Sequence, residues 1–188
     1  MIVLSYPTEI ASWVPVPKRS HAFTKDDLKT WAVSAAETAI GLRGSGDLET
    51  LVLELLQFVP SPEEVDRVVY MPTLGPSMAL VEFDVGAIKD GWREALIEGW
   101  SQGPAPMRPI EVDEVTLGDL ADAFRLVYTS ERKGSLVIVM GFAGRIGDQV
   151  VSATAYVKHL SVAAELAEAM SVFCSRLELA NEAETAHS

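Results

Sequence analysis

The sequence predicts an α+β domain with a mostly antiparallel sheet of about six to seven strands, an N-terminal helical hairpin and a C-terminal helix packed on the sheet. Apolar residues recur at helical spacing between positions 24 and 56. Four β-rich runs follow one another between positions 110 and 158, and an amphipathic pattern begins at position 161. We expect residues 1–180 to form one domain and residues 181–188 to form a polar tail.

The first segment, residues 2–16, is expected to be an edge strand that leads into a loop containing Trp13. β-forming residues stand at both ends of this segment. Pro7, Pro15 and Pro17 exclude a helix interior, because proline lacks a backbone N–H and clashes with the preceding turn. The segment is therefore interpreted as extended.

Two helices are expected next, joined by a glycine-rich turn. Thr24 and Asp27 have the spacing of a capping box, so the first helix is predicted over residues 24–42. Ser45 or Asp47 is placed to cap the second helix, which must stop before the prolines that follow. Two consecutive amphipathic helices form a hairpin, which has to cover a sheet face or another helix. Their apolar stripes comprise Leu28, Trp31, Ala32, Ala35, Ala39 and Leu42 in the first helix and Leu48, Leu51, Val52, Leu55 and Leu56 in the second.

The middle of the chain is expected to contain a strand hairpin, a short helix and a connector. The strands cover residues 67–71 and 79–85 and are joined by a turn. Apolar residues at steps of four predict a helix over residues 87–100, although two glycines weaken it. Residues 101–109 contain three prolines, which indicates a connector rather than an element. The helical positions are Ile88, Trp92, Leu96 and Trp100.

The final third is expected to be a meander of four strands followed by a helix. Turn residues separate the four β-rich runs, which cover residues 110–117, 123–129, 136–142 and 150–158. The third run is apolar at nearly every position, as expected of a central strand that is covered on both faces. The closing helix begins at Ser161. Its apolar stripe contains Val162, Leu166, Ala169, Met170, Phe173 and Leu177.

The charge balance limits the partners that this chain is expected to have. The 188 residues include 27 Asp and Glu against 15 Lys and Arg, which gives a formal net charge of −12. A negative field of this kind repels phosphate backbones and anionic lipid, so it argues against nucleic acid and membrane partners. Basic proteins, cations and neutral small molecules stay possible. The alternative is that the acidity serves solubility alone.

The expected location is cytoplasmic. Cys174 is the single cysteine, so no intrachain disulfide forms, and this usage suits a reducing compartment. The first residues have neither the cationic region nor the cleavage site of a signal peptide. No apolar run approaches the roughly 20 residues that a membrane-spanning helix needs.

No catalytic residue, metal ligand or cofactor is predicted. The glycine-rich segment 141–147 lies between two expected strands, so a hairpin is favoured over a phosphate-binding loop, which needs a helix N-terminus. His21, His159 and His187 are too scattered for a zinc site with converging ligands. Cys174 lies in an amphipathic helix and is interpreted as a small core residue rather than a nucleophile.

Six residues are candidates for partner binding. Four carboxylates surround an expected turn without the spacing of a calcium loop, and they either bind a partner or form a solvated rim. Two tryptophans, one in a proline-bounded loop and one at a helix end, either anchor a partner or are buried in the core. The candidates are Trp13, Trp100, Asp113, Glu114, Asp119 and Asp122.

The order of these elements resembles that of bacterial members of the PsbP-like fold. The similarity lies in Ile2–Pro17, with the run Trp13-Val14-Pro15, and in Phe124–Leu179, with the run Ser161-Val162-Ala163-Ala164-Glu165-Leu166. The resemblance implies an antiparallel sheet with helices on its faces. It also implies a role in binding other proteins, since members bind photosystem subunits, a nuclear-transport GTPase or cell-envelope partners. It implies no site residues, because the fold has no shared motif to map onto this chain.

The sequence favours a non-enzymatic interaction module that presents an acidic surface to a basic protein partner. An adaptor, a chaperone, a toxin-neutralising protein and a secretion-associated partner are concrete forms of it. One alternative is a small-molecule-binding protein with a pocket between the sheet and the helices, lined by Trp31, Trp92 or Phe142. The other alternative is an enzyme of unrecognised type.

Overall fold

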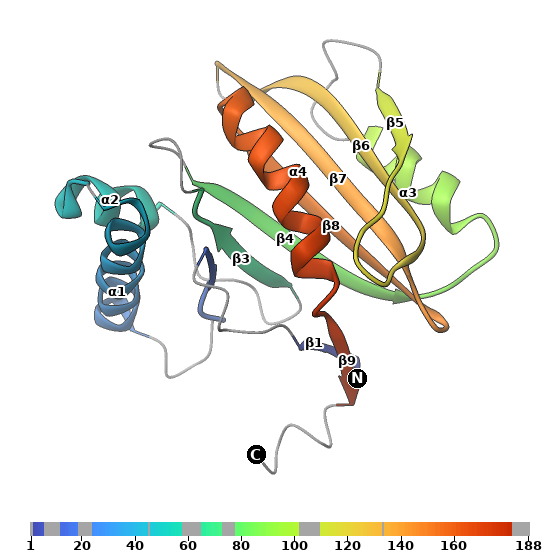
Figure 1. Ribbon diagram of the computed structural model, residues 1–188, viewed down its shortest axis with the longest axis horizontal. Helices are drawn as coiled ribbons and strands as arrows, with labels where there is room; N and C mark the ends of the chain where they lie inside the picture. Colours follow the sequence, from blue (N-terminus) through green and yellow to red (C-terminus); the bar gives the residue numbers. More distant parts are fainter. Residues whose placement is uncertain are drawn as a thin grey trace.

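A computed structural model describes residues 2–5, 12–18, 24–44, 46–57, 65–72, 78–101, 110–132 and 134–181. Within these residues, four helices accompany a seven-stranded antiparallel sheet and a two-stranded ribbon (Figure 1), which confirms the α+β class. The elements in chain order are β1 (Ile2–Ser5), β2 (Trp13–Pro15), α1 (Lys25–Arg43), α2 (Leu48–Leu55), β3 (Asp66–Tyr70), β4 (Ala79–Ala87), α3 (Trp92–Ser101), β5 (Glu111–Glu114), β6 (Ala121–Arg132), β7 (Ser135–Ile146), β8 (Gln149–Val157), α4 (Leu160–Cys174) and β9 (Glu178–Asn181).

The strands of the large sheet lie in the order β2-β3-β4-β8-β7-β6-β5, and every neighbouring pair is antiparallel. Strands β5 to β8 form the expected meander. The long pairing of β4 with β8, from Leu80 opposite Tyr156 to Ala87 opposite Gln149, joins the first hairpin to the last strand. The N-terminal and C-terminal parts of the chain therefore share one sheet.

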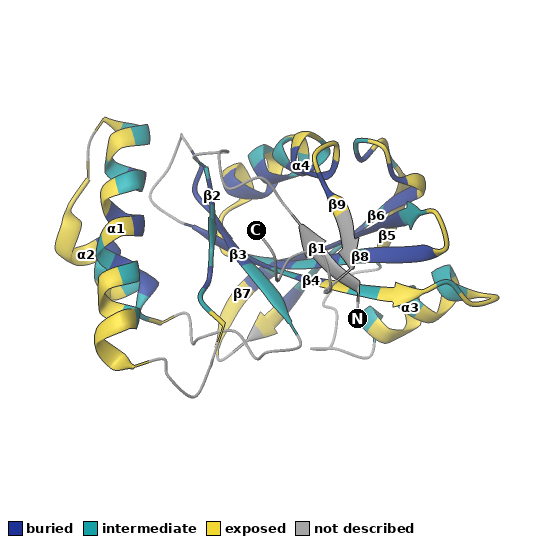
Figure 2. Ribbon diagram, turned by 90° about the horizontal axis from the view of Figure 1, so that it is seen from below, coloured by how far each residue is buried: buried dark blue, intermediate teal, exposed yellow. Residues whose placement is uncertain are grey.

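Helices cover both faces of this sheet. Figure 2 shows α4 on one face, with α3 on the opposite face and α1 and α2 at the β2–β3 end. Alternate residues of β7 point to opposite faces: Met140 and Phe142 pack in the cluster beneath α4, and Val139 packs in the cluster with α3. This arrangement confirms that the apolar run 136–142 is a strand covered on both faces.

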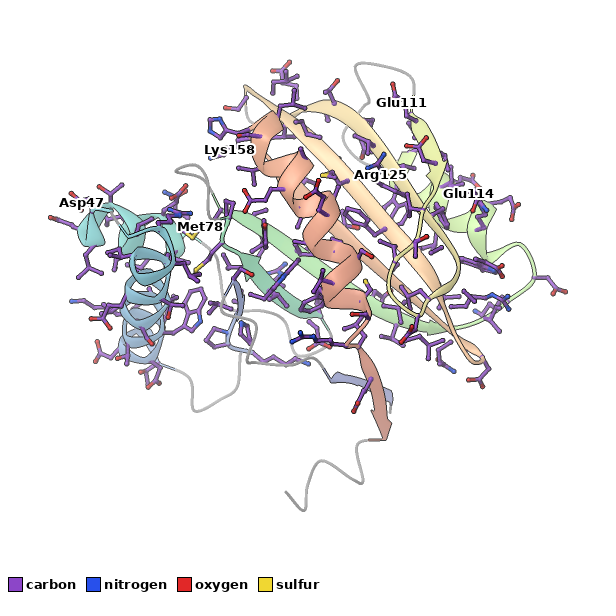
Figure 3. The ribbon with its side chains drawn as sticks, in the orientation of Figure 1. Asp47, Met78, Glu111, Glu114, Arg125 and Lys158 are labelled. Carbon is purple, nitrogen blue, oxygen red and sulfur yellow. The ribbon has the colours of Figure 1, made fainter. Side chains whose placement is uncertain are left out.

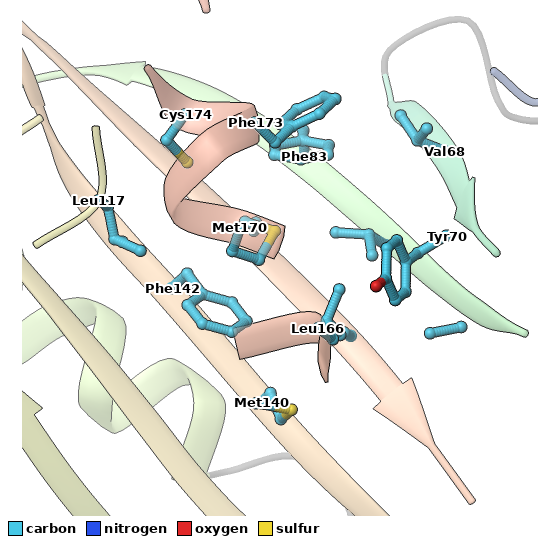
Figure 4. Close-up of a cluster of buried hydrophobic side chains, with 14 of the residues drawn as sticks. Val68, Tyr70, Phe83, Leu117, Met140, Phe142, Leu166, Met170, Phe173 and Cys174 are labelled. Atoms are coloured by element: carbon cyan, nitrogen blue, oxygen red, sulfur yellow. The ribbon is translucent and has the colours of Figure 1, made fainter. Parts of the chain in front are cut away.

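The main core lies between α4 and the sheet (Figure 4). Phe173 is fully buried there, with ring centroids 4.4 Å from Trp13 and 5.2 Å from Phe83. Burying a large apolar side chain contributes roughly 1.5–3 kcal/mol, so α4 is held chiefly by this layer. Its fully or nearly fully buried members include Tyr70, Val81, Phe142, Val162, Leu166 and Met170.

Two smaller apolar clusters attach the helices of the other face. The α1–α2 hairpin packs on the side chains of Val69, Met71 and Met78 at the end of the sheet near β2 and β3. The α3 helix packs on the strands β6 and β7. The residues of this α3 cluster are Ile97, Trp100, Ile110, Leu126, Tyr128, Val137, Val139 and Tyr156.

The predicted edge strand over residues 2–16 is wrong in one respect, because two strands of different sheets replace it. β1 pairs with β9, with Ile2 opposite Asn181, whereas β2 pairs with β3, with Trp13 opposite Tyr70. Extended residues pair with whichever strand the tertiary fold brings beside them. A partner at the far end of the chain leaves no local signal in the sequence.

The predicted ends of two helices also need correction. The last helix stops at Cys174 rather than at Leu177, and β9 follows it. Leu177 is still buried, so its apolar character reflects the core and not the helix. The helix expected from residue 87 starts at Trp92, because β4 continues through Ala87. Residues 182–188 of the expected tail lie outside the described residues.

The helix caps follow the sequence signals. The hydroxyl of Thr24 accepts a hydrogen bond from the Asp27 N–H, and the Asp27 carboxylate accepts one from the Thr24 N–H at 2.8 Å. The Thr24 hydroxyl also donates to the Asp27 carboxylate at 2.7 Å, and this hydrogen bond, together with the one from the Thr24 N–H, holds the pKa of Asp27 below its usual value. Asp47 caps α2 by accepting a hydrogen bond from the Thr50 N–H at 2.9 Å. The reciprocal hydrogen bonds of Thr24 and Asp27 confirm the predicted capping box at the start of α1.

Cys174 is expected to react with thiol reagents only after unfolding. The side chain is buried at the end of α4, and burial raises the pKa of its thiol to about 12. The thiolate is the reactive form, so the folded protein at neutral pH presents neither access nor nucleophile. Ellman's reagent should therefore label the protein in guanidinium chloride but not in buffer. Fast labelling of the folded protein would contradict the buried position.

Candidate functional site

The three aromatic residues proposed to line a small-molecule pocket do not converge. Phe142 belongs to the core beneath α4, whereas Trp31 packs in the hairpin cluster and donates its Nε1–H to the Pro15 carbonyl at 2.9 Å. Trp92 lies on α3, with its ring centroid 5.8 Å from that of Phe124. An open depression of about 360 Å³ lies on α1, and it is lined by Lys29, Thr30, Val33, Ser34 and Glu37.

Trp13 lies in the core. It is 3% exposed, and its ring centroid is 4.8 Å from that of Tyr70. A partner cannot use a side chain enclosed in this way without opening the core. Of the two interpretations of Trp13, the structure therefore shows the buried one, and we do not retain it as a binding residue.

Trp100 attaches α3 to the sheet. Its Nε1–H donates to the Thr154 hydroxyl at 2.9 Å, and its backbone carbonyl accepts a hydrogen bond from the Tyr128 hydroxyl at 3.1 Å. The indole ring lies directly over Gly141 of β7 and meets the edge of Phe124. These contacts occupy both the polar and the apolar parts of the ring, so Trp100 acts as an internal anchor.

Substitution of Gly141 by alanine is expected to lower the free energy of unfolding by about 1–3 kcal/mol. A Cβ at this position would lie 2.8 Å from the Trp100 ring, so the ring and α3 must move away. Gly86→Ala in β4 is the matched control, because a Cβ there meets nothing within 4 Å. Urea unfolding and tryptophan fluorescence measure both. Equal stability of the two variants would show that Trp100 does not rest on β7.

Of the four candidate carboxylates, Asp113 and Glu114 lie on β5, Asp119 lies on the connection from β5 to β6, and Asp122 lies at the start of β6. Figure 3 labels Glu114 and, on the same strand, Glu111. Glu111, which sequence reasoning did not select, extends the group along the same strand. Every residue of β5 is exposed, which is typical of a short edge strand. We call these residues the acidic flank: Glu111, Asp113, Glu114, Asp119 and Asp122.

Arginines accompany three carboxylates of the acidic flank. Arg125 of β6 binds Asp113 at 2.8 Å, and Arg93 of α3 binds Glu114. Arg145 of β7 binds Asp122, which has a φ of 50° beside the bulge in β6. The carboxylate side chains remain 51–69% exposed in these pairs.

Exposed ion pairs of this kind contribute about 0–1 kcal/mol each to stability. A cationic side chain of a partner can therefore bind these carboxylates beside the arginines, or in their place, with little loss of stability. Glu111 and Asp119 are exposed and form no ion pair with another described residue. Counted over the described residues, the acidic flank thus holds five carboxylates against three guanidinium groups. It keeps a net negative charge that solvent and partners can reach.

The arginines of the acidic flank were missed at the sequence level. Arg125 occurs within the β-rich run 123–129, where a charged residue in an apolar strand is a signal of pairing with a neighbouring strand, whereas Arg145 occurs in the glycine-rich segment 141–147, which the structure shows to be the end of β7. Arg93 lies on a different element, so its pairing with Glu114 depends on how α3 docks. Strand order and helix docking determine these contacts, and neither is encoded by spacing.

The remaining candidate chemistry is limited. Within the described residues, no three His, Cys, Asp or Glu side chains are grouped to hold a metal ion. His159 occupies the N-cap position of α4 and is exposed, while His21 and His187 lie outside the described residues. The segment 141–147 forms the end of β7 and the turn into β8, which confirms the hairpin interpretation.

No helix in the described part of the chain is long and apolar enough to cross a membrane.

Comparison with known proteins assigns this chain to no family. No protein-family model matches the chain, and no curated protein matches its sequence. A solved structure described as LpqN, involved in cell envelope biogenesis of Mycobacterium tuberculosis, is 13% identical. The match covers 96% of this chain and 85% of that chain with a TM-score of 0.49, and we draw no argument about function from it.

Proposed function

We propose that this protein is a cytoplasmic, non-enzymatic interaction module that presents the acidic flank to a basic protein partner. The supporting observation is the placement of the charge: five exposed carboxylates lie on the edge strand β5, the connection that follows it and the start of β6, and three arginines among the described residues pair with them. The formal net charge of −12 adds attraction at longer range. The proposed membership of the PsbP-like fold, whose members bind proteins, agrees with this role.

The proposed attraction between the acidic flank and a basic partner is electrostatic, so its dependence on salt concentration can be measured. Charged groups at the rim of an interface accelerate association and select partners of opposite sign, and raised ionic strength weakens this attraction. Glu111 and Asp119 are the most informative residues to change, because neither is paired with a described arginine that its removal would leave unsatisfied. Neutralising them removes charge from the flank without disturbing the internal ion pairs.

Affinity purification from the native host at low and raised salt tests the proposal. We expect a basic protein that is retained at low salt and released as salt rises. The double variant Glu111→Gln and Asp119→Asn should weaken its capture several-fold. The matched control is Glu37→Gln and Glu49→Gln, which removes the same charge from exposed sites on α1 and α2. Binding that is indifferent to salt, or equal losses in both double variants, would refute the proposal.

A further inference from the structure

We propose that β5 is a docking edge, at which an extended basic segment of the partner adds to the sheet as its next strand. This inference rests on the proposed function and narrows its partner surface to one strand and one docking mode. In Figure 1, β5 is the outermost strand of its side of the sheet, beyond β6. A partner strand is inferred from the outward N–H and C=O groups of the β5 backbone and not from the acidic side chains alone.

The phase of the ladder shows which backbone groups of β5 point outwards. The Val115 N–H donates to the Ala123 carbonyl at 3.2 Å. Along an antiparallel strand, the backbone N–H and C=O groups of successive residues point alternately toward and away from the neighbouring strand. The backbone groups of Asp113 therefore point toward β6, whereas those of Val112 and Glu114 point away from the sheet. No described residue hydrogen-bonds these outward groups. With respect to the described part of the chain, these groups are therefore open to pairing with an added strand.

The side chains of β5 determine which strand fits. Glu111 and Asp113 point to the face of α4, and Glu114 points to the face of α3 together with Val112, which is 38% exposed. An added strand meets carboxylates on both faces and one apolar side chain on the α3 face. Lysine or arginine alternating with apolar residues complements this pattern.

A second copy of this chain is a poor occupant of the edge. Two β5 strands paired with each other would place carboxylates opposite carboxylates, which is destabilising. The other edge of the sheet is less suited to any added strand, because β2 spans three residues and includes Pro15, which has no N–H. The short, proline-containing β2 therefore favours β5 as the docking edge, and the charge of β5 favours a basic segment as its occupant.

Amide hydrogen exchange of the full-length protein tests the docking mode directly. The probe is a short synthetic peptide of alternating lysine and valine, with a glutamate–valine peptide as the charge control. At saturating lysine peptide, exchange at the Val112 and Glu114 amides should slow by about tenfold or more. The amide of Glu49, an exposed residue of α2, should not change. The glutamate peptide should leave every amide unchanged.

A proline variant separates strand addition from charge attraction. Val112→Pro removes the outward N–H and leaves the ladder with β6 intact, and proline is tolerated on an edge strand. We expect its affinity for the lysine peptide to fall by about tenfold. Val112→Thr keeps the N–H and the β-branched shape, so its affinity should stay within about twofold.

The outcomes distinguish the docking mode from the proposed function. Slowed exchange at Val112 and Glu114 with weakened binding of Val112→Pro supports strand addition. A second outcome is that neutralising Glu111 and Asp119 weakens binding, while Val112→Pro keeps its affinity for the lysine peptide and exchange at the Val112 and Glu114 amides is unchanged. In that case the docking mode is overturned and the proposed function stands. If neither set of changes affects binding, both are overturned.

Discussion

Replacement of Gly118 by alanine is expected to lower the free energy of unfolding by about 3–5 kcal/mol. Gly118 has a φ of 54°, a left-handed conformation in which a Cβ costs about 1–2 kcal/mol. A Cβ here would also lie 2.5 Å from the carbonyl carbon of Cys174 and closer still to the backbone of Ser175. The clash involves backbone on both sides, so the β5–β6 connection and the end of α4 must separate. Urea unfolding followed by circular dichroism measures the loss.

Gly147→Ala is the matched control for this prediction. Gly147 has a φ of 59°, but a Cβ there meets nothing within 4 Å. Its variant should lose only the backbone contribution, about 1–2 kcal/mol. Because the connection that contains Gly118 also carries Asp119, only Gly118→Ala should weaken partner binding. Equal destabilisation of the two variants would mean that contact with α4 does not constrain Gly118.

Replacement of Phe173 by alanine is expected to cost about 3–5 kcal/mol of stability. The side chain is fully buried between Trp13, Phe83 and the sheet, and its removal leaves a cavity that the surrounding strands cannot fill. The loss combines the transfer free energy of the ring with the lost packing around the cavity. Denaturant unfolding gives the magnitude, and near-ultraviolet circular dichroism reports the changed environment of Trp13.

Val172→Ala controls for the effect of truncating a side chain on the same helix. Val172 precedes Phe173 but is 55% exposed, so its variant should differ from the parent by less than about 0.5 kcal/mol. Phe173→Leu should recover part of the loss, because leucine refills most of the cavity. A Phe173→Ala variant as stable as Val172→Ala would contradict the described core.

Elements with strong local signals were predictable from the sequence. The capping box of Thr24 and Asp27 marked the start of α1, and the uninterrupted apolar run 136–142 indicated a strand covered on both faces. The meander followed from closely spaced turns, because short connections leave neighbouring strands little choice of partner. Each of these features depends on residues that are close in the sequence.

The candidate site was predictable only in part. Carboxylates around the β5–β6 connection were selected, and the structure places them on the surface. The two tryptophans could not be separated by spacing, since a ring beside a proline or at a helix end occurs both in cores and at interfaces. Burial of Trp13 against Phe173 and docking of Trp100 on Gly141 depend on strands that are distant in the chain.

The sequence by itself determined the fold class, the four helices, the meander and the acidic character of the surface. Periodicity, caps and turns act within a few residues, and charge is a sum over residue types. Only the tertiary structure decided that β4 pairs with β8, that β1 pairs with β9, and that β5 is an edge lined with carboxylates and arginines. These features are pairings between distant segments, which depend on how the elements pack together.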